Sequence, residues 1–331
     1  MQDRLLGTNG PQVSALGLGA MGMSDLYGPS DENESIATVH AALDAGVTLI
    51  DTGDFYGMGH NEMLLGRALK DHPRDQLTIS VKFGSHRGPD GQWLGFDGRP
   101  NAVKTSLAYT LRRLGTEYVD VYRPARIDPD VPIEDTVGAI AEMIQAGYVR
   151  HIGLSEVGAD TVRRAHAVHP IADLQIEYSL ISRGPEERII PTLRELGIGL
   201  TAYGVLSRGL LSGHWTRDRA LAGNDFRAYS PRFQGENLDR NLELVTALGE
   251  IAESLRVTVA QVAIAWVLSR GKDIVPLIGA RRRERLSEAI GALDVELSPA
   301  DLARIEQAVP ADAAAGERYA GAQMQMLDSE R

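Results

Sequence analysis

The fold is decided by a stretch that runs from residue 48 to residue 83. It opens with the apolar run Thr48-Leu49-Ile50-Asp51, continues through a helix-like segment at residues 61–70, and closes with Leu77-Thr78-Ile79-Ser80-Val81-Lys82-Phe83. Both runs are almost continuously apolar, which is typical of strands buried on two faces. A strand, a helix and a second strand in this order predict a parallel βαβ unit.

The same alternation continues along the 331-residue chain. Eight strand-like runs separated by helix-like segments predict an α/β fold, a closed (β/α)8 barrel that forms a single domain over residues 1–331. The other strand-like runs are residues 16–20, 118–122, 151–155, 174–178, 198–203 and 274–278. The other helix-like segments are residues 32–45, 102–114, 133–146, 160–169, 186–196, 238–255 and 258–269.

Four further segments stand outside this alternation. Residues 4–13 are expected to form a hairpin that closes the bottom of the barrel, and residues 298–309 an appended helix that begins at Ser-Pro. Residues 84–100 and 204–238 are long loops after the third and seventh strands, on the face that carries catalysis in barrel enzymes. Their aromatic side chains are expected to line a substrate pocket or, equally, to pack against the barrel rim: Trp93, Phe96, Trp215, Phe226, Tyr229 and Phe233.

The composition narrows the class of protein. The formal net charge of −11 disfavours nucleic acid and anionic membranes as partners, because both would repel the chain. Cysteine is absent, which excludes disulfides, thiolate nucleophiles and zinc–thiolate sites. Residues 1–7 have no basic flank followed by a long apolar run, and no stretch is apolar for long enough to span a bilayer. We therefore expect a cytoplasmic protein, and its oligomeric state stays open.

Two motifs suggest chemistry that the surrounding sequence does not support. Residues 17–22 satisfy the G-x-G-x-x-G pattern, but Gly28 and Pro29 follow where a dinucleotide-binding helix would have to open. Asp51, Asp54 and His60 could suggest a metal-dependent hydrolase, but matching histidines at other strand ends are not evident. We expect no metal site.

Three polar residues stand at strand ends. Asp51 closes the second strand, Tyr56 follows shortly after it, and Lys82 interrupts the third strand. A buried lysine is costly unless a carboxylate pairs with it, so Asp51 is its expected partner. Lys82 could then lower the pKa of Tyr56 and make it a proton donor. The alternative is a structural ion pair beside an unrelated tyrosine.

These residues stand in stretches that resemble the aldo-keto reductase family. Asp51-Thr52-Gly53-Asp54-Phe55-Tyr56-Gly57 is similar to the family's signature, and Ser80-Val81-Lys82-Phe83-Gly84 to the strand that carries its lysine. Residues 16–23, 153–156, 175–179 and 201–204 are similar to the first, fifth, sixth and seventh strands of the family. The resemblance implies a (β/α)8 barrel that uses NADP(H) to reduce small-molecule aldehydes or ketones. It also implies catalytic roles for Asp51, Tyr56 and Lys82, with Tyr56 as the general acid.

The resemblance also implies which positions bind the cofactor. The nicotinamide end would contact Ser155, Glu156, Gln175 and Tyr203, the pyrophosphate Leu206, Ser207 and Gly209, and the adenosine end Arg281, Arg285 and Glu288. An independent argument comes from residues 279–285, an arginine-rich turn after the eighth strand that opens a helix, where barrel enzymes often bind phosphate. In an acidic chain this cluster favours NADP over NAD, although a solvated helix face has the same composition.

The sequence departs from the family at one catalytic position. The family's fourth catalytic residue, a histidine, is matched by Ala125, which has no donor for a substrate carbonyl. Tyr56 could act alone, another donor such as Arg123, Arg126 or His86 could replace the histidine, or the protein could bind NADPH with little turnover. The substrate pocket is expected to be lined by Met23, Trp93, Arg123, Ala125 and Arg126.

Four functions are compatible with these residues. The favoured one is an NADPH-dependent reductase of aldehydes or ketones. A nucleotide-binding regulatory protein, like the potassium-channel β subunits that share the family's fold, would bind NADPH without consuming it. A physiological alcohol or sugar dehydrogenase would run the same chemistry in reverse, and reduction of a C=C bond would suit the changed carbonyl-polarising position.

Overall fold

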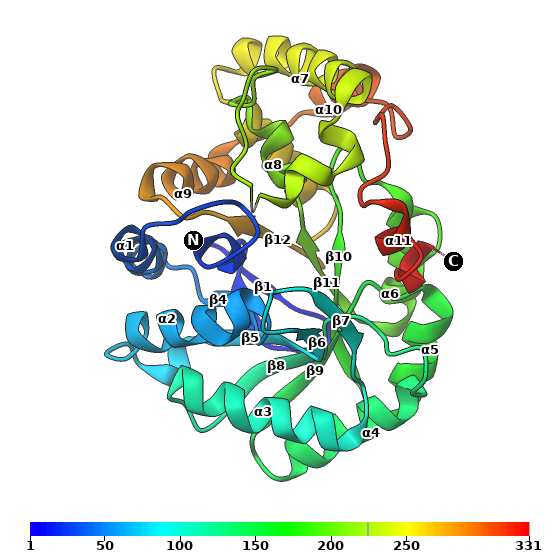
Figure 1. Cartoon of the computed structure of the whole chain (residues 1–331). Coiled ribbons are helices and arrows are strands. Elements are labelled where there is room, and N and C mark those ends of the chain that lie inside the picture. Colours follow the sequence, from blue (N-terminus) through cyan, green and yellow to red (C-terminus); the bar gives the residue numbers. More distant parts are fainter. Residues whose placement is uncertain (224, 331) are drawn as a thin grey trace.

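The structure is a computed structural model that describes residues 1–223 and 225–330. The barrel expected from the sequence forms its centre. Within these residues, eight parallel strands close in the order β10-β11-β12-β3-β4-β5-β8-β9, with helices around them (Figure 1). The predicted (β/α)8 fold is therefore confirmed. The barrel strands are β3 (Gly17–Gly19), β4 (Leu49–Gly53), β5 (Thr78–Phe83), β8 (Val119–Pro124), β9 (Val149–Ser155), β10 (Ile171–Glu177), β11 (Gly199–Tyr203) and β12 (Ile274–Gly279).

A helix lies in every connection between consecutive barrel strands. The helices of these connections are α1 (Glu32–Asp44), α2 (His60–Ala68), α3 (Pro100–Leu114), α4 (Ile133–Gln145), α5 (Ala159–Val168), α6 (Ile189–Leu196), α7 (Gly235–Leu255) and α8 (Val259–Ser269). After β12 come α9 (Arg283–Ile290), α10 (Pro299–Ala308) and the short α11 (Gly321–Met324). The Ser-Pro start of α10 is confirmed, because Ser298 caps it and exchanges hydrogen bonds with Asp301.

The predicted N-terminal hairpin closes the bottom of the barrel. Strands β1 (Asp3–Leu5) and β2 (Gln12–Ser14) pair in antiparallel fashion. Leu6 and Val13 form an apolar cluster with Leu49 and Val275, which lie near the amino-terminal ends of β4 and β12. The catalytic face of the barrel is therefore at the opposite end, where the strands end.

The two long connections contain more structure than expected. Residues 84–100 include an antiparallel hairpin of β6 (Ser85–Arg87) and β7 (Trp93–Phe96), and the connection after β11 contains 3-10 helices at Ser207–Ser212, Phe226–Tyr229 and Pro231–Phe233. The predicted long connections after the third and seventh strands are present, and these short elements within them are additions to the prediction. These elements are short and one hairpin strand is largely exposed, so they leave no apolar periodicity in the sequence.

Strand alternation decides which side chains reach the barrel interior. In β5, Phe83 points outward and stacks on Tyr122, with ring centroids 4.3 Å apart, while the Tyr122 hydroxyl donates to the carbonyl of Val103 in α3. Ser80 and Lys82 point inward, toward Asp51 of β4. The polar residues of the third strand therefore belong to an interior layer.

Across residues 1–223 and 225–330, no single helix is long and apolar enough to cross a membrane, although α7 and α8 meet that criterion together, by length and composition, as a pair bent by 87°.

Candidate active site

Asp51, Lys82 and Tyr56 lie together at the ends of the second and third barrel strands. Lys82 Nζ forms an ion pair with Asp51 Oδ1 and lies 5.2 Å from the centre of the Tyr56 ring. Gln175 of β10 completes the group, since its Oε1 accepts from Lys82 Nζ at 3.0 Å and its Nε2 donates to Asp51 Oδ2 at 2.8 Å. The barrel thus gathers four of the predicted site residues from three strands and one loop.

The acid–base properties of this group follow from burial. Burial lowers the pKa of Lys82 more than Asp51 raises it, and the Arg123 guanidinium lowers it further. Burial and then the Asp51 carboxylate raise the pKa of Tyr56 well above its ordinary value. The expected lowering of the Tyr56 pKa by Lys82 was therefore wrong for this state, because desolvation dominates and Arg126 is the nearby cation that opposes it. The phenol keeps its proton at neutral pH.

Arg123 belongs to the barrel interior and not to a substrate pocket. Its side chain is fully buried and forms an ion pair of 2.9 Å with Asp173, while its Nη2 donates to Ser80 Oγ at 2.9 Å. Ser80 Oγ in turn donates to Asp51 Oδ2 at 2.8 Å. A Cβ atom at Gly153 would lie 2.9 Å from the Arg123 guanidinium carbon, so this pair requires glycine there. The sequence assignment of Arg123 to the pocket is corrected accordingly.

The other predicted pocket residues separate into two groups. Met23 was expected to line the substrate pocket, but its side chain is buried in the hydrophobic core. Ala125 is also buried, and its N–H donates to the carbonyl of Phe83. Arg126 follows it at the mouth of the barrel and is partly exposed. Trp93 is exposed and packs edge-on against Phe55, which packs edge-on against Tyr56.

The aromatic side chains of the long loop after β11 serve different purposes. Trp215 and Phe233 are buried against each other, with ring centroids 4.6 Å apart, as expected from the alternative of rim packing. Phe226 packs edge-on against Tyr27 of the first long turn, and Tyr229 is 72% exposed. Only Trp93 of the loop aromatics thus connects to Tyr56, through Phe55.

The C-terminal segment reaches into the barrel mouth. Arg318 forms ion pairs with Glu156, which follows β9, and with Glu177, the last residue of β10, at 2.6 and 3.6 Å. Burial alone would raise the pKa of Glu156, but the hydrogen bonds and charge of Arg318 outweigh it and lower the pKa to about 2. The Glu156 carboxylate, expected beside a nicotinamide, is thus already occupied by Arg318, by the Tyr203 hydroxyl at 2.6 Å and by Ser329.

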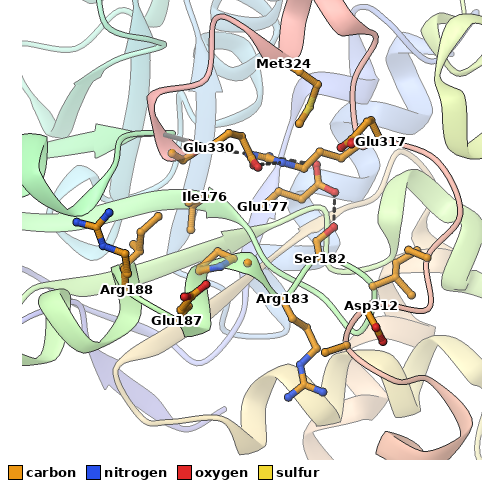
Figure 2. A pocket seen from close by; sticks show the side chains of 18 of the residues that line it. Ile176, Glu177, Ser182, Arg183, Glu187, Arg188, Asp312, Glu317, Met324 and Glu330 are labelled. Atoms are coloured by element: carbon orange, nitrogen blue, oxygen red, sulfur yellow. Dashed lines mark hydrogen bonds and ion pairs between the residues drawn. The ribbon is translucent and has the colours of Figure 1, made fainter.

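A cavity of about 600 Å³ lies under this segment. Among its lining side chains, Figure 2 shows Glu177 and Ser182 from the end of β10 and the turn after it, and Asp312 and Glu330 from near the C-terminus. Glu177 accepts a hydrogen bond from Ser182 there. The cavity reaches Arg318 and Glu177 but includes neither Tyr56 nor Lys82 in its lining.

Tyr203 and Tyr319 meet above the strand ends. The Tyr319 hydroxyl lies 2.9 Å from that of Tyr203, which itself donates to Glu156, so Tyr319 is the donor between them. Arg208 lies over the Tyr319 ring at 4.3 Å. Tyr203 is the last residue of β11 and is partly exposed.

Two buried hydroxyls near the ends of barrel strands have no hydrogen-bond partner among the described residues. They are Ser155 Oγ at the end of β9 and Ser207 Oγ after β11. Buried polar groups are normally satisfied, so each orphan indicates a missing partner. Ser207, Arg208 and Gly209 also adopt left-handed backbone conformations in succession, with φ of 43°, 58° and 96°. Such strain in non-glycine residues is typical of ligand sites.

The predicted phosphate-binding turn lies beside a concentration of arginines. Arg285 contacts His214 and forms an ion pair of 3.0 Å with Glu288. Burial lowers the pKa of Arg281 first, and the neighbouring Arg227 and Arg282 guanidinium groups lower it further. Mutual repulsion of this kind is relieved by a bound anion.

Arg281 also links the arginine-rich turn to the turn after β3. Its Nη1 donates to the carbonyls of Tyr27 and Pro29 at 3.0 Å each. Tyr27 forms an isolated antiparallel bridge with Asp225 of the loop after β11. The turn after β3 and the loop after β11 are therefore joined to each other and to the arginine-rich turn.

The structure adds site residues that sequence reasoning missed. Arg318 and Tyr319 come from a segment without periodicity or motif, and Arg227 from the middle of a long loop. No sequence signal separates these residues from the other arginines and tyrosines of the same segments. Among the described residues, no group of three or more histidine, aspartate or glutamate side chains is placed to hold a metal ion.

The barrel and the side chains at its carboxyl-terminal mouth define a (β/α)8 enzyme of the oxidoreductase type. The sequence pattern of the Aldo/keto reductase family matches residues 15–310, and the chain belongs to this family. Its members are carbonyl-reducing oxidoreductases that act on small molecules with nicotinamide cofactors.

Individual relatives cover nearly the whole chain. Probable aldo-keto reductase 1 from Glycine max is 44% identical over 322 residues, which span 96% of this chain and 92% of that protein. The structure of a glycerol dehydrogenase from Gluconobacter oxydans has a TM-score of 0.84 at 28% identity, covering 92% of this chain and 94% of that one. A thermostable aldo-keto reductase in complex with the inhibitor epalrestat has a TM-score of 0.74 at 28% identity, covering 93% of this chain and 100% of that one.

Proposed function

We propose that this protein reduces aldehydes or ketones with NADPH, and that Tyr56 is the proton donor. The observation that carries the proposal is the buried group of Asp51, Lys82 and Gln175 beside Tyr56 at the strand ends. Three strands converge on this group, and the buried lysine has both a carboxylate and an amide partner. A merely structural pair would not need a phenol within reach.

The chemistry divides between the cofactor and the chain. Bound nicotinamide supplies the hydride that reduces the carbonyl carbon. Tyr56 donates its proton to the carbonyl oxygen, so that the alcohol leaves neutral. Lys82, held by Asp51, lies 5.2 Å from the Tyr56 ring and stabilises the phenolate that remains after proton transfer. Gln175 fixes the orientation of both charged groups.

The cofactor assignment rests on the orphaned hydroxyls and the arginines. Ser155 Oγ would hold the nicotinamide carboxamide and Ser207 Oγ the pyrophosphate, which satisfies both groups. Tyr203 offers a ring for stacking, while Leu206 and Gly209 flank Ser207 in the same strained loop. Arg281, Arg285 and Glu288 would surround the adenosine 2′-phosphate end, which favours NADP over NAD.

Ala125 occupies the position of the family's histidine and has no side-chain hydrogen-bond donor. Arg123 cannot replace the histidine, since it is buried and committed to Asp173 and Ser80. His86 is exposed on β6. Arg126 lies at the barrel mouth, and its charge opposes the rise in the pKa of Tyr56.

The similarity to a glycerol dehydrogenase favours one alternative, oxidation of an alcohol by the same residues in reverse. In that direction Tyr56 would accept the hydroxyl proton. A regulatory protein that binds NADPH without consuming it remains the alternative from a different class, and the same assay separates the three.

The test is turnover of a panel of aromatic and aliphatic aldehydes with NADPH, and of the matching alcohols with NADP⁺. We expect wild-type reduction, and a loss of kcat in Tyr56→Phe by about 10²- to 10⁴-fold, the usual contribution of a general acid. Tyr229→Phe, a matched change at an exposed tyrosine, is expected to keep wild-type rates. Unchanged turnover in Tyr56→Phe would exclude the assigned role, and tight NADPH binding without turnover would favour the regulatory protein.

A further inference from the structure

Arg126 is a guanidinium without an acidic partner at the mouth of the barrel. It follows Ala125, just beyond the end of β8. Its Nη1 donates to the carbonyl of Ala125 at 2.6 Å and its Nη2 to the Tyr319 hydroxyl at 3.4 Å. Throughout residues 1–223 and 225–330, no carboxylate oxygen lies within ion-pair distance of it. A guanidinium has five N–H donors, so most of its hydrogen-bonding capacity is free.

The missing counterion is explained by the neighbouring arginine. Glu156 is the carboxylate whose charge reaches Arg126, but both of its oxygens accept hydrogen bonds from Arg318. Glu177 is likewise committed to Arg208, Arg232 and Arg318. The acids of the mouth are therefore neutralised by other cations. A partly buried charge that stays unpaired is costly, and it points to a ligand that brings the opposite charge.

Arg126 stands where a substrate would be held. The N–H of Ala125 donates to the carbonyl of Phe83, the residue after Lys82, so Arg126 lies just beyond the strand ends that carry Lys82. The charge of Arg126 also opposes the rise in the pKa of Tyr56. An anion bound by Arg126 would therefore lie beside the position of the carbonyl group that Tyr56 protonates.

We infer that Arg126 binds a carboxylate group of the substrate, so that the preferred substrates are aldehydes or ketones that carry a carboxylate near the carbonyl. This inference rests on the proposed reductase function and deepens it. The planar fork of arginine matches a carboxylate with two parallel hydrogen bonds, and arginine keeps its charge at every working pH. The Tyr319 hydroxyl accepts a hydrogen bond from Arg126 Nη2 at 3.4 Å and so helps to orient the guanidinium.

The experiment compares acids with their methyl esters, which keep the size and remove the charge. Three pairs vary the spacing between carbonyl and carboxylate: phenylglyoxylate, 3-carboxybenzaldehyde and 4-carboxybenzaldehyde, each against its ester. The quantity measured is the acid-to-ester ratio of kcat/KM, because intrinsic carbonyl reactivity cancels when this ratio is compared between wild type and variant. We expect Arg126→Gln to lower the ratio by about 10- to 100-fold for at least one pair, mainly through KM of the acid.

Two further variants sharpen the comparison. Arg126→Lys keeps the charge but loses the fork, and should retain part of the preference for the acid. Arg163→Gln removes one positive charge from the exposed face of α5, where Arg163 is paired with Glu195, and should leave the ratio unchanged. An acid-to-ester ratio in Arg126→Gln that matches wild type for all three pairs overturns the inference.

Two other results would also overturn it. If acid and ester rates fall together while the NADPH dissociation constant stays the same, Arg126 polarises the carbonyl itself. If the NADPH dissociation constant rises in Arg126→Gln, the residue holds the cofactor.

A binding measurement separates this inference from the proposed function. Isothermal titration calorimetry of 4-carboxybenzyl alcohol, with NADPH present, requires no turnover. Tighter binding of this acid than of its methyl ester in wild type, lost in Arg126→Gln, supports the carboxylate site even if no aldehyde is reduced. Equal binding of acid and ester by wild type overturns it, whereas absence of all reduction by wild type overturns the reductase proposal.

Discussion

Asp54 lies two residues before Tyr56, and its carboxyl group is largely shielded from water. Its Oδ1 is buried and accepts no hydrogen bond from any described residue, while its Oδ2 accepts a long one of 3.3 Å from Gly84. Burial and then the negative charge of Glu62 raise the pKa of Asp54 to about 7. This carboxyl group therefore titrates in the pH range where the protein would work.

The raised pKa has a defined effect on stability. The folded state holds a proton on Asp54 between about pH 4 and pH 7, where the unfolded chain has lost it. The free energy of unfolding therefore falls as pH rises through this window, by at most about 1.4 kcal/mol per pH unit from this group. We expect Asp54→Asn to gain stability relative to wild type as pH rises from 5 to 8, measured as the difference in denaturant midpoint at each pH.

A control for this prediction is Asp90→Asn, which removes one negative charge from an exposed loop. A difference between Asp54→Asn and wild type that stays constant from pH 5 to 8 would show that Asp54 does not titrate in this window.

Two arginines of α9, the helix after β12, have different partners. Arg285 faces His214 and Glu288, whereas Arg283 forms an ion pair of 3.0 Å with Glu34 of α1. Arg285 therefore belongs to the proposed 2′-phosphate region, whereas Arg283 links α9 to α1. The two residues form a matched pair for testing cofactor choice.

We expect Arg285→Gln to raise the dissociation constant for NADPH by about tenfold or more, and that for NADH by less than about threefold, because only NADPH carries the 2′-phosphate. Quenching of protein fluorescence on titration measures both constants. Arg283→Gln should change neither. Equal losses for NADPH and NADH in Arg285→Gln would assign the residue to a part of the cofactor that both share.

Sequence periodicity was sufficient for the barrel and its helices, because each strand buries a continuous apolar run. It was insufficient for the β6–β7 hairpin, whose Trp93 and Leu94 are exposed and leave no alternation. At the site, Asp51 and Lys82 could be paired from their places at strand ends. The different positions of Arg123 and Arg126 could not be predicted from the sequence. They follow from the pairing of β5 with β8, which sets Arg123 beside Lys82 inside the barrel and leaves Arg126 beyond the strand end.

At the scale of the whole molecule, the barrel mouth is completed by the far end of the chain. Arg318 supplies the counter-charge for Glu156, which follows the fifth barrel strand, and for Glu177, which ends the sixth. Gly158 at the start of α5 donates to Asp328 at 2.8 Å, and Ser329 donates to Glu156. Figure 1 shows this C-terminal segment, with α11, on the side of the barrel where α5 begins. The site therefore depends on residues that follow all barrel strands.

Removing the Arg318 charge should loosen this segment. Arg318→Gln leaves Glu156 without its bidentate partner, and breaking a buried ion pair typically costs about 3–5 kcal/mol. We expect faster hydrogen exchange in residues 311–330, measured by mass spectrometry, while exchange in β4 and β5 stays slow. Arg304→Gln, a change on the exposed face of α10, is the control. Wild-type exchange in the Arg318→Gln segment would show that the ion pairs do not hold it.

Acid should have the same effect on wild type. The pKa of Glu156 is lowered in the folded state, so the stability that its charge contributes is complete above about pH 4.5 and is lost as pH falls toward 2. Exchange in residues 311–330 should therefore accelerate in this range before the barrel unfolds.

The placement of Arg318 also sets an order of events during synthesis. A chain emerging from the ribosome presents every barrel strand before residues 311–330 exist, so Glu156 and Glu177 must first face water without Arg318. Arg208 and Arg232 are already present for Glu177, but Glu156 has to wait. A barrel that closes before residues 311–330 are made would leave Glu156 with the Tyr203 hydroxyl as its partner, and Tyr203 and Tyr319 would meet last.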